Sequence, residues 1–221
     1  MKEPALMGWS GGKDSALALH EIIKDDKYSI TLLTTITADY KRISMHGVRE
    51  ELLQAQADSL NLPLEKVYIP KECSNEEYDR LMENTLKNYL SSGYRTMIFG
   101  DIFLQGIREY REKNLAKVDM KALFPLWGKN TRELSRAFIQ NNFKAIITCV
   151  DNTTIDERFI GRIYDESFLD DLPDNTDPCG ENGEFHSFVY DGPIFSKPIQ
   201  YSKGEVVLKN NRFYFCDLLN L

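Results

Sequence analysis

The segment Ala5-Leu6-Met7-Gly8-Trp9-Ser10-Gly11-Gly12-Lys13-Asp14-Ser15 joins a short apolar run to a helix-like stretch that begins at Ala16. Its two adjacent glycines allow a tight turn in which no side chain blocks the approach of a ligand to the backbone. Backbone N–H groups at the start of a helix converge on phosphate oxygens, and Lys13 adds a positive charge there. The segment therefore predicts a strand, a phosphate-binding loop and a helix, in this order.

This loop differs from the common P-loop, because Met7 stands where that motif has its first glycine and Asp14 follows the lysine. The stretch instead resembles the PP-loop of the N-type ATP pyrophosphatases, which implies that ATP is cleaved between its α and β phosphates. The residues implied in ATP binding are Ser10, Gly11, Gly12, Lys13, Asp14 and Ser15. Lys13 would oppose charge on the α phosphate, and Asp14 would orient the loop or reach a metal.

Short apolar runs alternate with segments of helical period, which predicts a parallel sheet covered by helices on both faces. The expected strands are residues 6–9, 31–36, 67–69, 97–99 and 145–150. The expected fold is thus α/β, and the PP-loop resemblance implies that it is a Rossmann-like (HUP-type) five-stranded parallel sheet. Ligands of such sheets bind at the carboxyl ends of the strands. Thr37, after the second strand, and Gly100 and Asp101, after the fourth, are therefore expected to line a nucleotide site.

The pattern changes after about residue 151, where helical periodicity fades and an acidic stretch follows at residues 165–177. Beyond it, residues 185–190, 194–201, 205–209 and 212–216 have the pattern of strands, with Asn210-Asn211 as a hairpin turn. We expect a PP-loop ATP-binding domain at residues 1–155 and a smaller, strand-rich α+β domain at residues 156–221.

A second motif, Gly180-Glu181-Asn182-Gly183-Glu184-Phe185-His186-Ser187, precedes Asp191-Gly192-Pro193. Two carboxylates in such a turn can hold a cation, receive an amine or relay protons, whereas the alternative is a polar turn without chemistry. Together with the PP-loop, in this order, the motif resembles the signature of the diphthine:ammonia ligase family. Residues 99–102 and 123–127 also resemble segments of that family, so the similarity extends over nearly the whole chain.

This resemblance implies an amide-forming ligase. A carboxylate and ATP would form an acyl adenylate and pyrophosphate, and ammonia would then displace AMP. The family substrate is diphthine on elongation factor 2, so the expected acceptor is a carboxylate on a protein or a small molecule. Magnesium is expected because pyrophosphate is a poor leaving group until its charge is matched, but the sequence does not identify the metal ligands.

The family resemblance and the chemistry of the side chains indicate which residues would act on the acceptor or on ammonia. Glu181 and Glu184 would handle the acceptor or ammonia and His186 would shuttle a proton near neutral pH. Gly180 and Gly183 would shape the substrate-binding loop. His46 matches a family position and would either line the acceptor site or cap the helix that follows it.

The composition of the chain argues against several other classes of function. The formal net charge of −7 gives no general attraction to nucleic acid, and no apolar run approaches the length of a membrane span or a signal core. We therefore expect a cytoplasmic protein without nucleic-acid or membrane partners. The four cysteines form no Cys-x-x-Cys pair, which argues against a tRNA sulfur-transfer enzyme. A different acceptor and a non-catalytic ATP-binding sensor remain as alternatives, and a homo-oligomer stays open.

Overall fold

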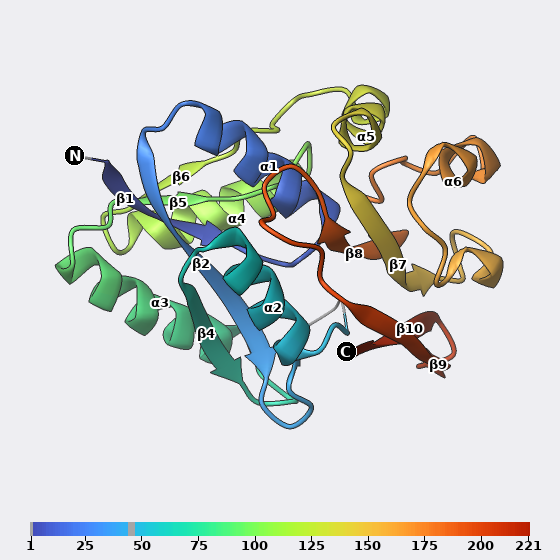
Figure 1. Cartoon of the computed structure of the whole chain (residues 1–221). Coiled ribbons are helices and arrows are strands. Elements are labelled where there is room, and N and C mark those ends of the chain that lie inside the picture. The colour runs from blue at the N-terminus through green and yellow to red at the C-terminus, as the bar shows by residue number, and fades with distance from the viewer. Residues whose placement is uncertain (1, 44–46) are drawn as a thin grey trace.

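Two β-sheets organise the chain in the computed structural model, which describes residues 2–43 and 47–221 (Figure 1). The first sheet has five parallel strands in the order β4-β2-β1-β5-β6 and a short antiparallel strand, β3, at the end of β2. These strands are β1 (Glu3–Gly8), β2 (Tyr28–Thr37), β3 (Arg42–Ile43), β4 (Leu64–Ile69), β5 (Thr96–Ile98) and β6 (Lys121–Leu123). The predicted α/β class and the parallel sheet are confirmed.

Helices cover both faces of this sheet, as the alternation predicts. They are α1 (Lys13–Lys24), α2 (Glu50–Leu60), α3 (Asn75–Ser91) and α4 (Gln105–Ala116). Successive side chains of a strand point to opposite faces. Ala5 and Met7 of β1 accordingly pack into the core that contains α1 and α2, whereas Leu6 packs into a second core with Leu86 of α3 and Leu115 of α4.

Helix starts are encoded locally by side-chain caps. The Ser74 hydroxyl accepts a hydrogen bond from the Glu77 N–H at 3.1 Å, where α3 begins. Asn130 accepts hydrogen bonds from two N–H groups at the start of α5 (Thr131–Gln140). In each case the serine or asparagine of a capping-box pair, Ser74 with Glu77 and Asn130 with Glu133, makes the contact.

The second sheet is antiparallel, with the order β8-β7-β10-β9. Its strands are β7 (Lys144–Asp151), β8 (Phe185–Asp191), β9 (Tyr201–Lys209) and β10 (Phe213–Asn220), and the 3₁₀-helix η1 (Glu157–Phe159) and α6 (Glu166–Asp171) lie between β7 and β8. The hairpin turn between β9 and β10 is confirmed, because Asn210 and Asn211 both have positive φ, +54° and +52°. Most of residues 194–201, expected as a strand, lie outside any strand.

The prediction that residues 145–150 form a strand of the parallel sheet is wrong. They belong to β7, which pairs antiparallel with β8 and β10, and β6 lies beside β5 instead. β7 is buried from Ala145 to Asp151, and a continuous apolar run is typical of any strand buried on both faces, in either kind of sheet. β6 has three residues, of which Lys121 is exposed, so it lacks an apolar run.

Apolar residues of both sheets share one core, which includes Met7 of β1, Ala16 of α1, Ile147 of β7 and Phe188 of β8. The division of the chain at residue 155 stays a prediction. None of the helices in the described ranges combines the length and the apolar character that crossing a membrane requires.

Gln56 of α2 joins the loop between β1 and α1, at residues 9–12, to both sheets. It is fully buried, and its Nε2 donates to the Gly11 carbonyl (3.0 Å) and the Val189 carbonyl (2.6 Å). Its Oε1 accepts from the Trp9 indole N–H at 2.9 Å. The Val189 N–H also donates to the Gly11 carbonyl (2.9 Å). One side chain thus satisfies three buried polar groups where the loop, α2 and β8 meet.

Gln56→Leu should lower the free energy of unfolding by about 2–4 kcal/mol, because a buried polar group left without a partner costs roughly 1–3 kcal/mol. Urea denaturation followed by circular dichroism measures the change. Gln54→Leu on the same helix is the control, since it removes only the exposed bond to Asp58 and should change stability by less than about 0.5 kcal/mol. Equal stabilities of the two variants would contradict the role given to Gln56.

Candidate functional site

A cavity of about 340 Å³ lies at the carboxyl ends of β1 and β5, where the strand order of the parallel sheet reverses direction. Among the predicted site residues it is lined by Ser10, Asp14, Ser15, Gly100, Asp101 and His186. Its apolar part is formed by Leu33, Met82, Leu86, Met97 and Phe99. The two motifs, far apart in the sequence, therefore contribute to one cavity.

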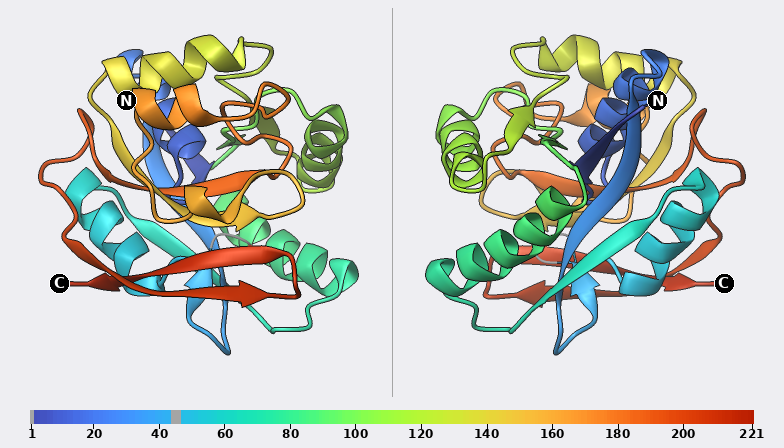
Figure 2. Two further views of the ribbon diagram at one scale, coloured as in Figure 1. Left: turned by 90° about the vertical axis from the view of Figure 1, so that its right-hand side faces the viewer. Right: turned by 90° about the vertical axis from the view of Figure 1, so that its left-hand side faces the viewer.

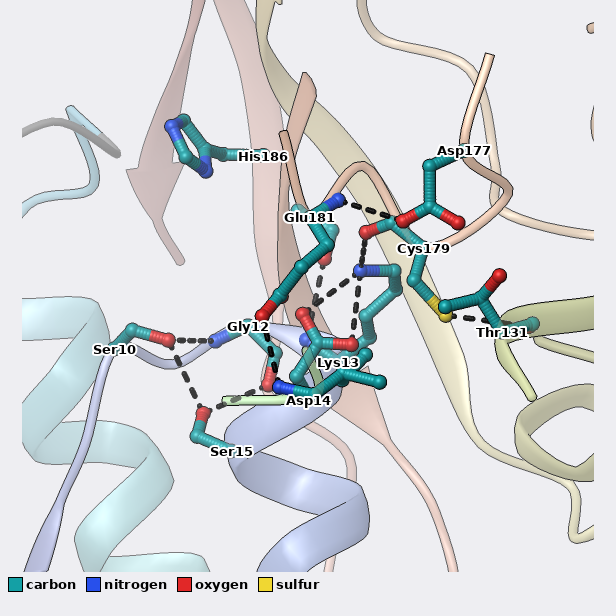
Figure 3. A network of polar contacts seen from close by, with 12 residues as sticks. Ser10, Gly12, Lys13, Asp14, Ser15, Thr131, Asp177, Cys179, Glu181 and His186 are labelled. Atoms are coloured by element: carbon teal, nitrogen blue, oxygen red, sulfur yellow. Dashed lines mark hydrogen bonds and ion pairs between the residues drawn. The ribbon is translucent and has the colours of Figure 1, made fainter. Parts of the chain in front are cut away.

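The loop between β1 and α1 is shaped by Gly11, whose φ is +73°. A Cβ atom there would lie 2.7 Å from the Gln56 Oε1 and 2.8 Å from a Leu53 methyl carbon, so both conformation and space require glycine. Ser10 Oγ accepts from the Gly12 N–H at 3.2 Å, and Ser15 Oγ donates to the Gly12 carbonyl at 2.8 Å. The serines thus hold the turn and present their hydroxyls beside the cavity (Figure 3).

Gly100 brings the end of β5 against the first turn of α1. A Cβ atom at this position would lie 2.9 Å from the carbonyl carbon and oxygen of Asp14, which are backbone atoms that cannot move aside. The next residue, Asp101, forms an ion pair with Arg111 of α4, with 2.9 Å between Oδ2 and Nε. The Arg111 guanidinium lies 4.2 Å from the centre of the Phe99 ring. A fixed carboxylate–guanidinium pair therefore borders the cavity.

Lys13 is buried, with 4% of its surface exposed, and it is not among the residues that line the cavity. Its Nζ lies 2.8 Å from Asp14 Oδ2 and donates to the Cys179 carbonyl (Figure 3). It also lies 5.8 Å and 5.4 Å from the ring centres of Tyr164 and Phe185. The ammonium of the PP-loop therefore points toward the loop of the second motif.

The charges of this pair depend on each other. Burial raises the pKa of the Asp14 carboxyl more than the neighbouring Lys13 lowers it. Burial would lower the pKa of the Lys13 ammonium, but the Asp14 carboxylate and further charges nearby raise it above its ordinary value. Burial therefore disfavours the charged form of both groups, and for Lys13 the neighbouring charges outweigh it.

Glu181 connects the second motif to the end of β5. Its Oε1 accepts from the Ile102 N–H, just after β5, at 2.8 Å, and its own N–H donates to Asp177 Oδ2 at 2.9 Å. The turn needs Gly180, whose φ is +65° and whose Cβ would lie 2.8 Å from the Phe185 carbonyl. Burial raises the pKa of the Glu181 carboxyl to about 7, so this group can exchange protons at neutral pH.

Glu184, like Glu181, is not among the residues that line the cavity, but its environment differs. It is 5% exposed, and its Oε1 accepts from the Asp177 N–H (3.2 Å) and from the Asn182 amide (3.0 Å). Its buried Oε2 has no hydrogen-bond partner within the described residues. Gly183 beside it has φ of +89°, which a turn of this kind requires. Glu184 thus holds the turn that presents Glu181.

His186 lines the cavity from β8, but it does not titrate near neutral pH. Burial and the charge of Lys13 lower the pKa of its imidazole to about 4. The imidazole is therefore neutral at pH 7, and the proton shuttle stays a prediction. His46, the other candidate histidine, lies outside the described residues.

Thr37 ends β2 but does not line the cavity, which is reached instead by Thr34 and Thr35. Sequence reasoning also missed Tyr78 and Met82 of α3, which cover the cavity. Both belong to a helical stripe that is visible in the sequence. The stripe indicates a buried helix face, but only the crossing of α3 over the sheet places this face above the cavity.

Four carboxylates line the cavity, Asp14, Asp101, Asp79 and Glu83, and the first two follow the carboxyl ends of β1 and β5. Within residues 2–43 and 47–221, no three His, Cys, Asp or Glu side chains gather as metal ligands. Magnesium commonly takes only one or two carboxylates and completes its shell with phosphate oxygens and water. These residues therefore fit a magnesium ion that binds together with a phosphate ligand.

Known proteins resemble this chain over most of its length. The family model of the diphthamide synthase N-terminal domain matches residues 1–122, and that of the diphthamide synthase C-terminal domain matches residues 130–217. Diphthine–ammonia ligases of Mus musculus and Homo sapiens are each 26% identical to it, over 90% of this chain and 83% of theirs.

One solved structure is described as a predicted subunit of tRNA methyltransferase from Methanocaldococcus jannaschii. It is 18% identical to this chain, with a TM-score of 0.45, and the alignment covers 66% of this chain and 80% of that chain. The family resemblance rests on the two domain models, and the N-terminal one alone matches more than half of the residues. The chain therefore belongs to the diphthamide synthase family, and the two relatives named above are ligases.

Proposed function

We propose that this protein activates a carboxylate with ATP and joins it to ammonia, as a diphthine–ammonia ligase. One observation carries the proposal: the PP-loop and the second motif form one polar network beside the cavity. Lys13 donates to the Cys179 carbonyl, and Glu181 accepts from the N–H of Ile102 after β5. A nucleotide in the cavity would therefore have its reacting phosphate next to the groups that act on the acceptor.

ATP would bind with its phosphates at the first turn of α1 and its base in the apolar part of the cavity. The positive end of a helix dipole favours phosphate, and Ser10 and Ser15 offer hydroxyls there. Leu33, Met97 and Phe99 provide apolar surface for a flat base. The volume of about 340 Å³ lies within the range of roughly 300–1,000 Å³ that small-molecule sites occupy.

In the first step, an oxygen of the acceptor carboxylate would attack the α phosphorus. The bond from that phosphorus to the bridging oxygen breaks, and pyrophosphate leaves with the electron pair. Lys13 would stabilise the negative charge that develops, in a buried site where such an interaction is strong. Asp14 and Asp101 would hold magnesium, which supplies charge neutralisation for the phosphates.

In the second step, ammonia would attack the carbonyl carbon of the acyl adenylate, and AMP would leave. The nitrogen loses a proton as the amide forms. Glu181 is suited to accept it, because its pKa of about 7 lets the carboxylate form at neutral pH and still bind a proton. His186, neutral at this pH, would hydrogen-bond within the cavity, and Glu184 would hold the turn that carries Glu181.

Mass spectrometry of the products tests this function. The protein is incubated with ATP, magnesium, ammonium and elongation factor 2 that carries diphthine, beside a control without the factor. We expect AMP, pyrophosphate and a factor that has gained the amide. AMP without amidation would indicate a different acceptor, and the absence of AMP in both reactions would contradict the proposal and favour an ATP-binding sensor.

Lys13→Met should reduce AMP formation about 100-fold or more, because the variant keeps the buried volume but removes the charge beside the α phosphate. Release of AMP from labelled ATP measures the effect. Lys24→Met, at the exposed end of the same helix, is the matched control and should keep normal activity. Full turnover in Lys13→Met would contradict the assignment of the PP-loop.

Amide formation should rise with pH through about 7, since the proposed base is active only as a carboxylate. Glu181→Gln should lose this limb of the pH profile and form less amide, while the adenylation half-reaction remains measurable as release of pyrophosphate. A profile unchanged by Glu181→Gln would exclude this residue as the base.

The pH dependence of stability provides a second test of the raised Glu181 pKa. The folded-state pKa of Glu181 is raised, so its protonated form stabilises the fold below its ordinary pKa, and this contribution disappears as pH rises through about 7. Glu181→Gln should remove this part of the pH dependence from the melting temperature. This change reports on the burial of the carboxyl, independently of catalysis.

A further inference from the structure

β9 is an open edge of the second sheet. Within the described residues it pairs only with β10, whereas β8, at the opposite edge, is closed by the PP-loop through the bond from the Val189 N–H to the Gly11 carbonyl. The β9–β10 hairpin lies at the outer margin of this sheet (Figure 2). An unpaired edge presents a row of N–H and C=O groups that can pair with another strand.

The outer half of β9 is also exposed on both of its faces. All five residues from Glu205 to Lys209 are exposed, and the apolar ones are Val206 (50%), Val207 (38%) and Leu208 (44%). No proline interrupts the strand, and among the described elements β9 packs chiefly against β10. Three consecutive exposed aliphatic residues on an unpaired edge favour contact with another polypeptide.

The side chains of this segment form two sets. Val207 lies opposite Phe215 of β10, and Val206 lies opposite Cys216. Because neighbouring residues of a strand point to opposite faces, Glu205, Val207 and Lys209 share one face, and Val206 and Leu208 share the other. One face thus carries an acid, an apolar residue and a base in sequence.

We propose that β9 pairs antiparallel with β9 of a second copy of this chain, around a twofold axis at Val207. In this register Glu205 lies opposite Lys209 of the second copy, and Val206 lies opposite Leu208. Val207 meets its own equivalent on the axis. The pairing would join the two four-stranded sheets into one continuous eight-stranded sheet, with the same surface used by both copies.

Charge argues against the two registers on the N-terminal side, whereas an axis at Leu208 places Val207 opposite Lys209 and forms no acid–base pair. A twofold axis at Glu205 would place two carboxylates opposite each other, and an axis at Val206 would place Lys203 opposite Lys209. Like charges directly opposite in a sheet are destabilising, whereas opposite charges stabilise the pair. The axis at Val207 gives two acid–base pairs and buries the aliphatic residues of both faces, so the segment is complementary to itself.

Analytical ultracentrifugation of the full chain tests the proposal over a range of concentrations. The wild-type protein should sediment with about twice the monomer mass of 25.5 kDa. Val207→Glu, which places two carboxylates on the axis, should be monomeric. Ile23→Glu, at a residue of similar exposure (44%) on α1, is the matched control and should remain a dimer. A wild-type monomer, or a Val207→Glu dimer, would overturn the inference.

A charge exchange tests the register without the loss of an apolar residue. Glu205→Lys and Lys209→Glu should each raise the dimer dissociation constant about tenfold or more, since each creates two like-charge pairs. The double variant should restore an affinity within about threefold of wild type. Failure of the double variant to recover, with circular dichroism showing a folded protein, would rule out this register. A partner other than a second copy would leave the wild type monomeric, which also overturns the proposal.

Discussion

The site depends on one buried side chain, Gln56, which occupies the point where the phosphate loop, α2 and β8 meet. The loop carries a glycine in a left-handed conformation and has little apolar surface of its own, so its shape must be imposed from outside. A buried amide does this well, because each of its hydrogen bonds would be costly to leave unmade. The position of the second sheet and the shape of the loop are therefore coupled.

The packing of the two halves also determines the surroundings of the Lys13 charge. Lys13 belongs to the PP-loop by sequence, yet its ammonium is enclosed by the loop of the second motif and by two aromatic rings. A buried cation is tolerated only with compensating partners, which Asp14 and the Cys179 carbonyl provide. Groups from both halves of the chain thus compensate the buried ammonium that the proposed adenylation requires.

The two glutamates of the second motif illustrate how similar residues take different tasks. Glu181 meets the backbone after β5 and has its pKa near neutrality, whereas Glu184 binds the turn from within and keeps it in shape. Their separation by two residues is the same in any sequence with this motif. Their environments differ because the turn directs one side chain toward the parallel sheet and the other into the turn itself.

The sequence by itself determined the strand–loop–helix unit at Ser10–Ser15, the capped starts of α3 and α5 and the hairpin at Asn210-Asn211, because each depends on residues close together in the chain. It also indicated the family through two motifs. Only the tertiary structure decided that β7 joins the antiparallel sheet, that Thr34 and Thr35 rather than Thr37 reach the cavity, and that Lys13 faces Cys179. These outcomes depend on which buried surfaces meet, and apolar runs with the same local pattern can be buried against different partners.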